Sequence, residues 1–253
     1  MKQSALFRTI IIIIFFALGY YARRILPSSI TEMVYTPFWW LLFSVLGSLI
    51  LFDWRNVLSS LGLDTKMGSG LGIAFLLTLP MLIGYAFIGQ VNEEITPLNI
   101  IKGAFVAAFF EEVFFRGFLF GQLFRFSKWG FIPAVLANSI IFGIGHLYQG
   151  NSLSETLGVF SVTLVGGIWF AWLYIEWETL WLPIGLHLLM NLYWMIFNIS
   201  DTALGGFGAN IFRVTTIALS VYFTLRHCQK RGKFLINTQN LIWQRGSQNF
   251  FTL

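Results

Sequence analysis

The sequence predicts an all-α membrane protein, built as a polytopic bundle of about eight transmembrane helices. Composition is the first observation behind this prediction. Of the 253 residues, 57% are hydrophobic and 11% are charged, whereas soluble domains average roughly 45 to 50% apolar and about 25% charged residues. A soluble chain of this length could not cover so much apolar surface with polar groups, so we expect lipid to surround the protein.

The second observation is a series of long apolar runs. A helix of about 17 to 25 apolar residues crosses a hydrocarbon core of about 30 Å. The expected spans are residues 6–22, 35–52, 71–88, 101–124, 129–148, 157–175, 180–197 and 207–225. Connections such as 125–128 and 176–179 are short, so neighbouring helices must run antiparallel. We therefore predict one membrane domain over residues 1–253, of which residues 226–253 form a basic C-terminal tail.

The distribution of Lys and Arg indicates the orientation. With both termini in the cytoplasm, eleven of the 16 basic residues lie on the inner side, as expected for cytoplasmic loops. These are Lys2, Arg8, Arg55, Lys66, Arg125, Lys128, Arg226, Lys230, Arg231, Lys233 and Arg245. Only Arg23 and Arg24 fall clearly in an outer loop. The inner turn 176–179 is an exception to the pattern, because it has no basic residue. We expect an integral protein of a prokaryotic inner membrane. The net positive charge of the protein requires no nucleic acid partner to explain it.

Ionisable residues interrupt the fourth span. Glu111, Glu112 and Arg116 lie in an otherwise apolar run, where a charged side chain costs a few kcal/mol and usually faces a bundle interior or a wet cavity. Glu112 and Arg116 are four residues apart and can form a structural ion pair. Glu111 projects about 100° away around the helix and has no basic residue at that spacing. We therefore expect Glu111 to be a general base, because a desolvated carboxylate accepts a proton readily.

Two further spans contain polar pairs at helical spacing. Phe142 and His146 share a face near the end of the fifth span, and His187 and Asn191 share a face of the seventh. Each pair has a structural alternative, since His146 could be an interfacial residue and the His187–Asn191 pair could join helices by hydrogen bonds. Because Glu111 is mid-span and His146 is near a span end, their convergence requires the fifth helix to tilt strongly or continue past Tyr148.

The segments EEVFFR, FGIGH and HLLMN, in this order on successive apolar helices, resemble the CPBP family of intramembrane proteases, which includes CAAX-processing and bacteriocin self-immunity proteins. The resemblance covers residues 101–199 and implies that this region is the catalytic core. It implies that Glu111 activates water with help from His146, and that His187 and Asn191 form an oxyanion hole. Glu112, Arg116 and Phe142 are supporting residues, and no cofactor is required.

A zinc-dependent variant of the same protease is the alternative. Glu111, His146 and His187 resemble a His₂Glu zinc site with one open position. We favour the metal-free reaction because the sequence has no H-E-x-x-H segment, and because using Glu111 as a ligand would leave Glu112 as the only candidate base.

Two other functions remain open from the sequence. A non-enzymatic immunity or scaffold protein would tolerate alanine at Glu111. A transporter would use Glu111 and His187 as a proton relay, although we find no internal repeat of the kind many transporters have. For the protease, the expected partners are the lipid bilayer and a membrane-associated peptide or protein substrate. The sequence does not indicate whether this substrate is prenylated. The basic and apolar tail either lies along an anionic membrane face or only fixes the topology. The oligomeric state is not predicted.

Overall fold

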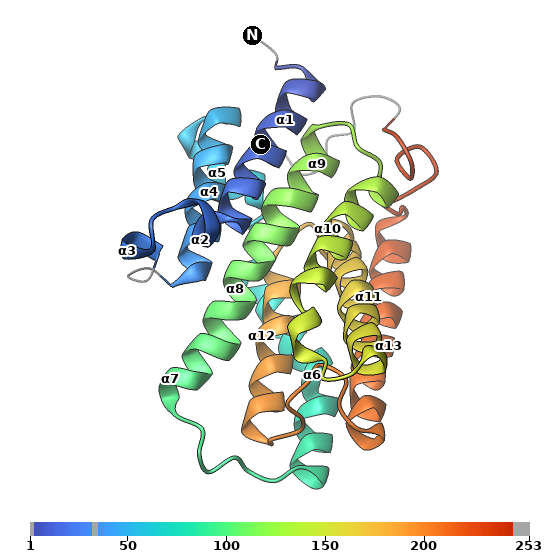
Figure 1. Ribbon diagram of the computed structural model, residues 1–253. Coiled ribbons are helices and arrows are strands. Elements are labelled where there is room, and N and C mark those ends of the chain that lie inside the picture. The colour runs from blue at the N-terminus through green and yellow to red at the C-terminus, as the bar shows by residue number, and fades with distance from the viewer. Residues whose placement is uncertain (1–2, 32–34, 245–253) are drawn as a thin grey trace.

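The protein is a bundle of helices in the computed structural model, which describes residues 3–31 and 35–244 (Figure 1). All regular elements in these two ranges are helical, so the predicted all-α class is confirmed. The helices outside the central segment are α1 (Ala5–Tyr20), α2 (Ala22–Ile25), α3 (Ser28–Thr31), α4 (Thr36–Leu51), η1 (Trp54–Asn56), α5 (Val57–Leu61), α6 (Met67–Ile88), α10 (Phe131–Gly145), η4 (Leu147–Gln149), α11 (Leu153–Trp177), α12 (Trp181–Ile196) and α13 (Phe207–Arg231).

One continuous helical segment over residues 97–126 forms the centre of the bundle. It consists of α7 (Pro97–Ile100), η2 (Ile101–Val106), α8 (Ala107–Glu111), η3 (Glu112–Phe120) and α9 (Gly121–Phe126). Thr96 caps its start and Pro97 occupies its first turn, where a missing N–H has no cost. The stretches η2 and η3 are π-helical, a form that occurs frequently at functional sites. Residues 112–125 of this central helix are all buried.

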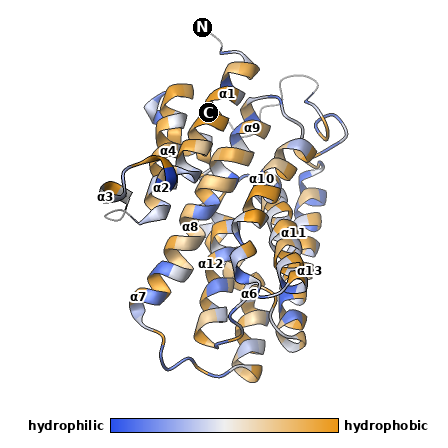
Figure 2. Ribbon diagram, in the orientation of Figure 1, coloured by the Kyte–Doolittle hydropathy of each residue, from blue (hydrophilic) through white to orange (hydrophobic). Residues whose placement is uncertain are grey.

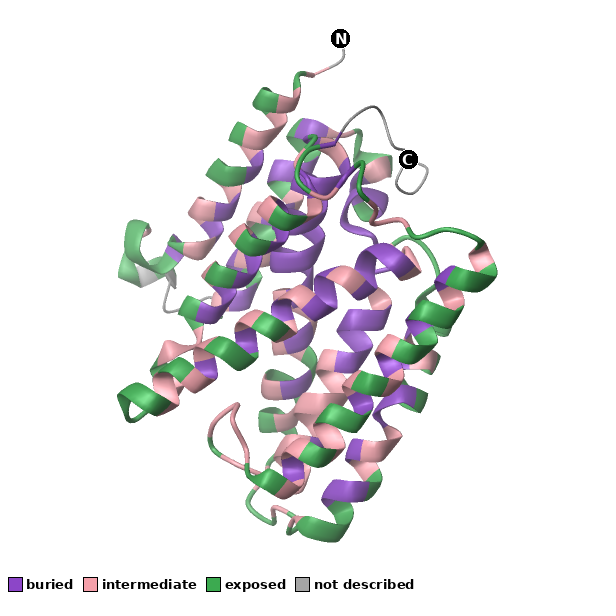
Figure 3. Cartoon of the chain, turned by 90° about the vertical axis from the view of Figure 1, so that its right-hand side faces the viewer, coloured by how far each residue is buried: buried purple, intermediate pink, exposed green. Residues whose placement is uncertain are grey.

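The other helices surround the central helix in pairs. The hairpin of α1 and α4 packs on one side and α10 and α11 on another. Helix α12 joins the central helix to α6, and α13 packs on α6. Close approach of the hairpin depends on glycine, because a Cβ on Gly47 would lie 2.7 Å from the Phe118 ring. Hydrophobic residues dominate the ribbon (Figure 2), and buried residues concentrate in its interior (Figure 3).

Each of the eight expected spans coincides with a helix or with the central helix. Four helical segments are long and apolar enough to cross a membrane: Met67–Ile88, Phe131–Gln149, Leu153–Trp177 and Phe207–Arg231. The shorter apolar helices α1, α4 and α12 have 16 residues each, about 24 Å at 1.5 Å per residue. A membrane protein with several spanning helices is therefore supported, and the count of eight spans stays a prediction.

Capping residues move some boundaries away from the ends of the apolar runs. Helix α11 begins four residues before the predicted span, at Leu153, because the Ser152 side chain accepts a hydrogen bond from Glu155 N. Helix α13 continues six residues beyond its predicted end and stops before Gly232, which has φ 76°. Residues 226–231, predicted as part of the tail, thus belong to α13.

The described part of the tail is bound to the bundle. The carboxylate of Glu176, which is fully buried, accepts hydrogen bonds from Leu235 N and Ile236 N, each at 3.0 Å. Backbone oxygens of Asn240 and Leu241 accept the N–H groups of the first turn of α10, each at 2.8 Å. These contacts tie the tail to α11 and cap α10. The predicted tail residues 245–253 lie outside the described residues.

Candidate active site

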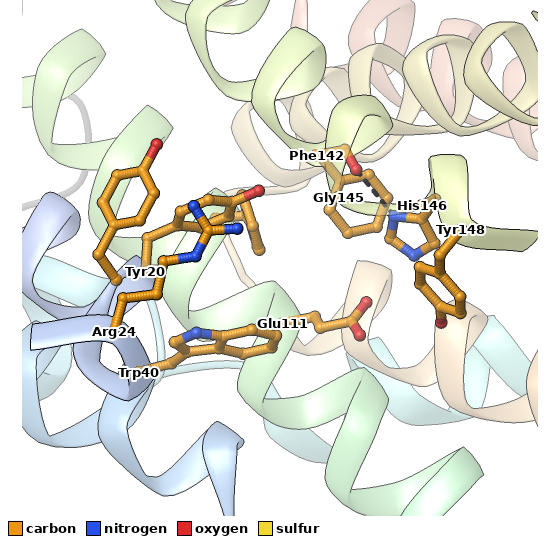
Figure 4. Close-up of a pocket in the computed structure, with 10 residues that line it drawn as sticks. Tyr20, Arg24, Trp40, Glu111, Phe142, Gly145, His146 and Tyr148 are labelled. Carbon is orange, nitrogen blue, oxygen red and sulfur yellow. Dashed lines mark hydrogen bonds between the residues drawn. The ribbon is translucent and has the colours of Figure 1, made fainter. Parts of the chain in front are cut away.

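A cavity of about 310 Å³ lies beside the central helix, between the end of α1 and the end of α10. Two predicted site residues, Glu111 and His146, line it from opposite sides, and both side chains point into it (Figure 4). The other lining residues are Tyr20, Tyr21, Arg24, Trp40, Phe115, Phe142, Gly145 and Tyr148. The cavity thus joins the motif residues to a mouth formed largely by aromatic side chains.

The Glu111 carboxylate is close to His187 and lines the same cavity as His146. Its side chain is 17% exposed, and Oε2 lies 3.9 Å from Nε2 of His187. This is a loose electrostatic contact rather than a hydrogen bond. Glu111 is therefore partly open to the cavity and is not held by a tight ion pair, which leaves its oxygens able to contact another group.

Glu112 is fully buried and contacts two partners through one oxygen. Arg116 Nη1 donates to Glu112 Oε1 at 3.1 Å, which confirms the expected ion pair. Nδ1 of His187 lies 2.8 Å from the same oxygen. Because a carboxylate only accepts hydrogen bonds, the proton of this contact belongs to Nδ1, and Nε2 is turned toward Glu111. Glu112 thus fixes both the position and the orientation of the His187 ring.

Arg116 connects this pair to the other histidine through aromatic packing. The guanidinium lies 4.1 Å from the centre of the Phe142 ring and 5.7 Å from that of Phe170, distances at which a cation is attracted to the ring. The backbone oxygen of Phe142 in turn accepts a hydrogen bond from His146 Nδ1 at 2.8 Å. The buried Glu112–Arg116 ion pair is therefore connected to His187 directly and to His146 through Phe142.

His146 lies at the junction of α10 and η4. Helix α10 ends at Gly145, and His146 N contacts the Gly143 oxygen as the chain enters η4. Helical structure resumes in η4 and reaches Gln149, one residue past Tyr148, after the break at His146. The cap places His146 at the helix end with Nδ1 held by Phe142, so that Nε2 is the ring atom available to the cavity.

Asn191 contacts the central helix rather than the other predicted residues. Its Nδ2 donates to the backbone oxygen of Gly103 at 3.2 Å. Gly103 lies in η2, one of the two π-helical stretches. One hydrogen of the Asn191 amide therefore joins α12 to the central helix. His187 and Asn191 both face that helix, as their spacing predicts, but they contact different turns of it.

The zinc alternative would use Glu111, His146 and His187 as the three protein ligands. Both histidines have Nδ1 engaged and Nε2 directed inward, an orientation that zinc ligands also use. A tetrahedral site requires three protein donors within about 2.3 Å of one point. Within residues 3–31 and 35–244, no three His, Cys, Asp or Glu side chains form a group that could hold a metal ion. The metal-free reaction therefore stays a prediction.

Several lining residues were missed by the sequence reasoning. Tyr20, Tyr21, Arg24 and Trp40 come from the N-terminal hairpin, and Tyr148 follows α10. They belong to no motif, and aromatic residues are abundant throughout the chain. One signal was available, since Arg23 and Arg24 stand out as basic residues in an expected outer loop.

Part of the chain that contains these residues is similar to known proteins. Residues 92–193, which include Glu111, His146, His187 and Asn191, match the family described as type II CAAX prenyl endopeptidase Rce1-like. Over this segment the chain is similar to the CAAX-processing proteases. It is also 36% identical over 103 residues to YdiL, a candidate membrane peptidase of Bacillus subtilis (strain 168). That match spans 41% of this chain and only 38% of YdiL. No solved structure matches the chain.

Proposed function

We propose that the protein is an intramembrane endopeptidase that hydrolyses a peptide bond in a membrane-associated peptide or protein. The observation that supports this most directly is the position of Glu111, whose carboxylate enters a cavity opposite His146 and lies 3.9 Å from His187 Nε2. A carboxylate and two imidazoles around one space provide the groups that water activation and charge stabilisation require. The match to the Rce1-like family and to a candidate peptidase points to the same reaction class.

In the proposed reaction, Glu111 takes a proton from a water molecule held between it and His146. The hydroxide so formed attacks the carbonyl carbon of the substrate, and a tetrahedral intermediate with one negatively charged oxygen results. Glu111 then returns its proton to the amide nitrogen as the carbon–nitrogen bond breaks. The products are a carboxylic acid and an amine, and Glu111 is a carboxylate again, so the cycle requires no other reactant.

His187 and Asn191 are the proposed donors to the negatively charged oxygen. Because Nδ1 of His187 contacts Glu112, Nε2 is the atom that faces the substrate, and it donates when it holds a proton. The Asn191 amide has two hydrogens, of which one goes to Gly103 and the other is left for the substrate. Donors fixed before the reaction stabilise charge that appears only in the transition state.

Proteolysis of a membrane-anchored peptide library tests this function. Purified protein is incubated with the library, and products are identified by mass spectrometry. We expect cleavage by the native chain and loss of cleavage in Glu111→Gln, which keeps the size of the side chain but cannot accept the proton. Glu94→Gln is the matched control, because Glu94 is exposed and outside the cavity. Equal cleavage by native protein and Glu111→Gln would contradict the role of Glu111, and no cleavage by either protein would favour the immunity or scaffold function.

A further inference from the structure

The antiparallel helices share two ends that differ in charge. At one end, Lys66 before α6 lies 3.2 Å from Glu178 after α11, and Arg231 at the end of α13 donates to the last turn of α11. At the other end, the side-chain oxygen of Gln149 after α10 accepts a hydrogen bond from Ala203 before α13 at 3.0 Å. We name the first the basic end and the second the opposite end.

Basic residues are concentrated at the basic end. Nine described Lys and Arg residues lie there: Arg8, Arg55, Lys66, Arg125, Lys128, Arg226, Lys230, Arg231 and Lys233. The opposite end has four: Arg23, Arg24, Lys102 and Arg213. Of these, Arg213 is engaged by the backbone oxygens of Ala203 and Leu204. All loops between the helices are short, which is the condition under which Lys and Arg decide orientation.

The mouth of the cavity is at the opposite end. Its residues come from places where α1 and α10 finish: Tyr20 and Tyr21 close α1, Arg24 follows in α2, and Tyr148 lies in η4. Tyr148 is 81% exposed. In the described part of the chain, no residue from the basic-end connections lines the cavity.

We propose that the cavity opens toward the extracytoplasmic side of the membrane, and that the substrate is a peptide segment presented from that side. The positive-inside rule places the basic end in the cytoplasm, and the cavity mouth belongs to the other end. A segment must reach Glu111 through this mouth, past Arg24 and the tyrosines. The substrate class is therefore exported or surface-displayed membrane peptides. This inference deepens the proposed peptidase function and rests on it.

Cysteine labelling tests the orientation without any assay of activity. The native cysteine, Cys228, is fully buried and is replaced by Ser, which keeps a donor to Glu176. Single cysteines are then placed at Leu153, at the start of α11 at the opposite end (77% exposed), and at Trp54 at the basic end (73% exposed). In intact bacterial spheroplasts, a membrane-impermeant maleimide should label Leu153→Cys, and should label Trp54→Cys only after permeabilisation. The reverse pattern overturns the proposal.

The side of the membrane from which the substrate enters is tested with two membrane-tethered reporters. Both contain the same cleavable sequence, chosen from the library. One reporter displays the sequence outside the cell membrane and the other displays it in the cytoplasm. We expect cleavage of the exported reporter alone, and loss of that cleavage in Glu111→Gln. Cleavage of the cytoplasmic reporter alone would overturn the inference while supporting the peptidase function. Cleavage of neither reporter would count against the peptidase function, and the labelling pattern would still decide the orientation.

Discussion

At the scale of single residues, Glu112 explains how a charged side chain is kept inside the bundle. Arg116 neutralises it, and His187 uses the same oxygen. A buried ion pair of this kind is weak support for stability, because desolvation offsets most of the attraction between the charges. Its contribution lies in fixing the ring of His187, so we consider Glu112 a positioning residue and Glu111 the proposed catalytic one.

We predict that Glu112→Gln lowers kcat by roughly 10- to 100-fold, the range found when carboxylates that orient imidazoles in metal sites are removed. KM should change little, because substrate binding does not depend on the ring orientation. The single variant leaves Arg116 buried without its charge partner, so Glu112→Gln/Arg116→Gln is the matched variant for folding. If the double variant folds like the native protein and has native kcat, Glu112 has no positioning role.

Arg24 allows a second residue-scale prediction. Its guanidinium is exposed at the cavity mouth and can donate to carbonyl or carboxylate oxygens of an arriving peptide. We expect Arg24→Gln to raise KM by roughly three- to tenfold, the loss of about 1 kcal/mol of binding, with kcat within about twofold. Steady-state kinetics check this, with neighbouring Arg23→Gln as control. A fall in kcat at unchanged KM would show that Arg24 acts in a step after substrate binding.

At the scale of elements, Glu176 shows how the end of the chain is attached. Its carboxylate is 0% exposed and accepts hydrogen bonds from the Arg231 side chain, Leu235 N and Ile236 N. Two residues later, Glu178 forms an ion pair with Lys66 in which both side chains are partly exposed. The two glutamates thus offer a buried and an exposed ion pair at the same end of α11.

Neutralising the buried partner should destabilise the fold far more than neutralising the exposed one. We predict that Glu176→Gln lowers the free energy of unfolding by about 3–5 kcal/mol, and Glu178→Gln by at most about 1 kcal/mol. Thermal unfolding in detergent measures the difference. Limited trypsin digestion should also cut near Lys233 more quickly in Glu176→Gln. Equal stability of the two variants would contradict the described attachment of the tail.

The sequence predicted where helices occur better than where they end. Apolar runs identify the parts of the chain that must leave water, and each run indeed forms a helix. The ends depend on capping residues that lie outside the runs, such as Ser152, whose side chain accepts a hydrogen bond, and Gly232, which has a positive φ. The π-helical stretches of the central helix were not predicted either, because hydropathy does not distinguish helix types.

At the scale of the whole molecule, long-range contacts separate what the sequence predicted from what it did not. Helical spacing predicted the Glu112–Arg116 pair, since both residues lie on one helix. It could not predict that His187, 75 residues away, would contact Glu112, or that Arg24 would line the cavity with Glu111. Such contacts depend on how the helices pack, and packing surfaces inside lipid differ little in hydrophobicity from outer ones.

The most direct test of the central claim is one rate measurement on a purified preparation treated with a strong chelator. The cleavage rate of one identified membrane peptide is compared between the native protein and Glu111→Gln. We predict that the native rate survives chelation and that Glu111→Gln is slower by roughly 10²- to 10⁴-fold, the contribution of a general base. Loss of native activity that stoichiometric zinc restores, or equal rates for the two proteins, would contradict this prediction.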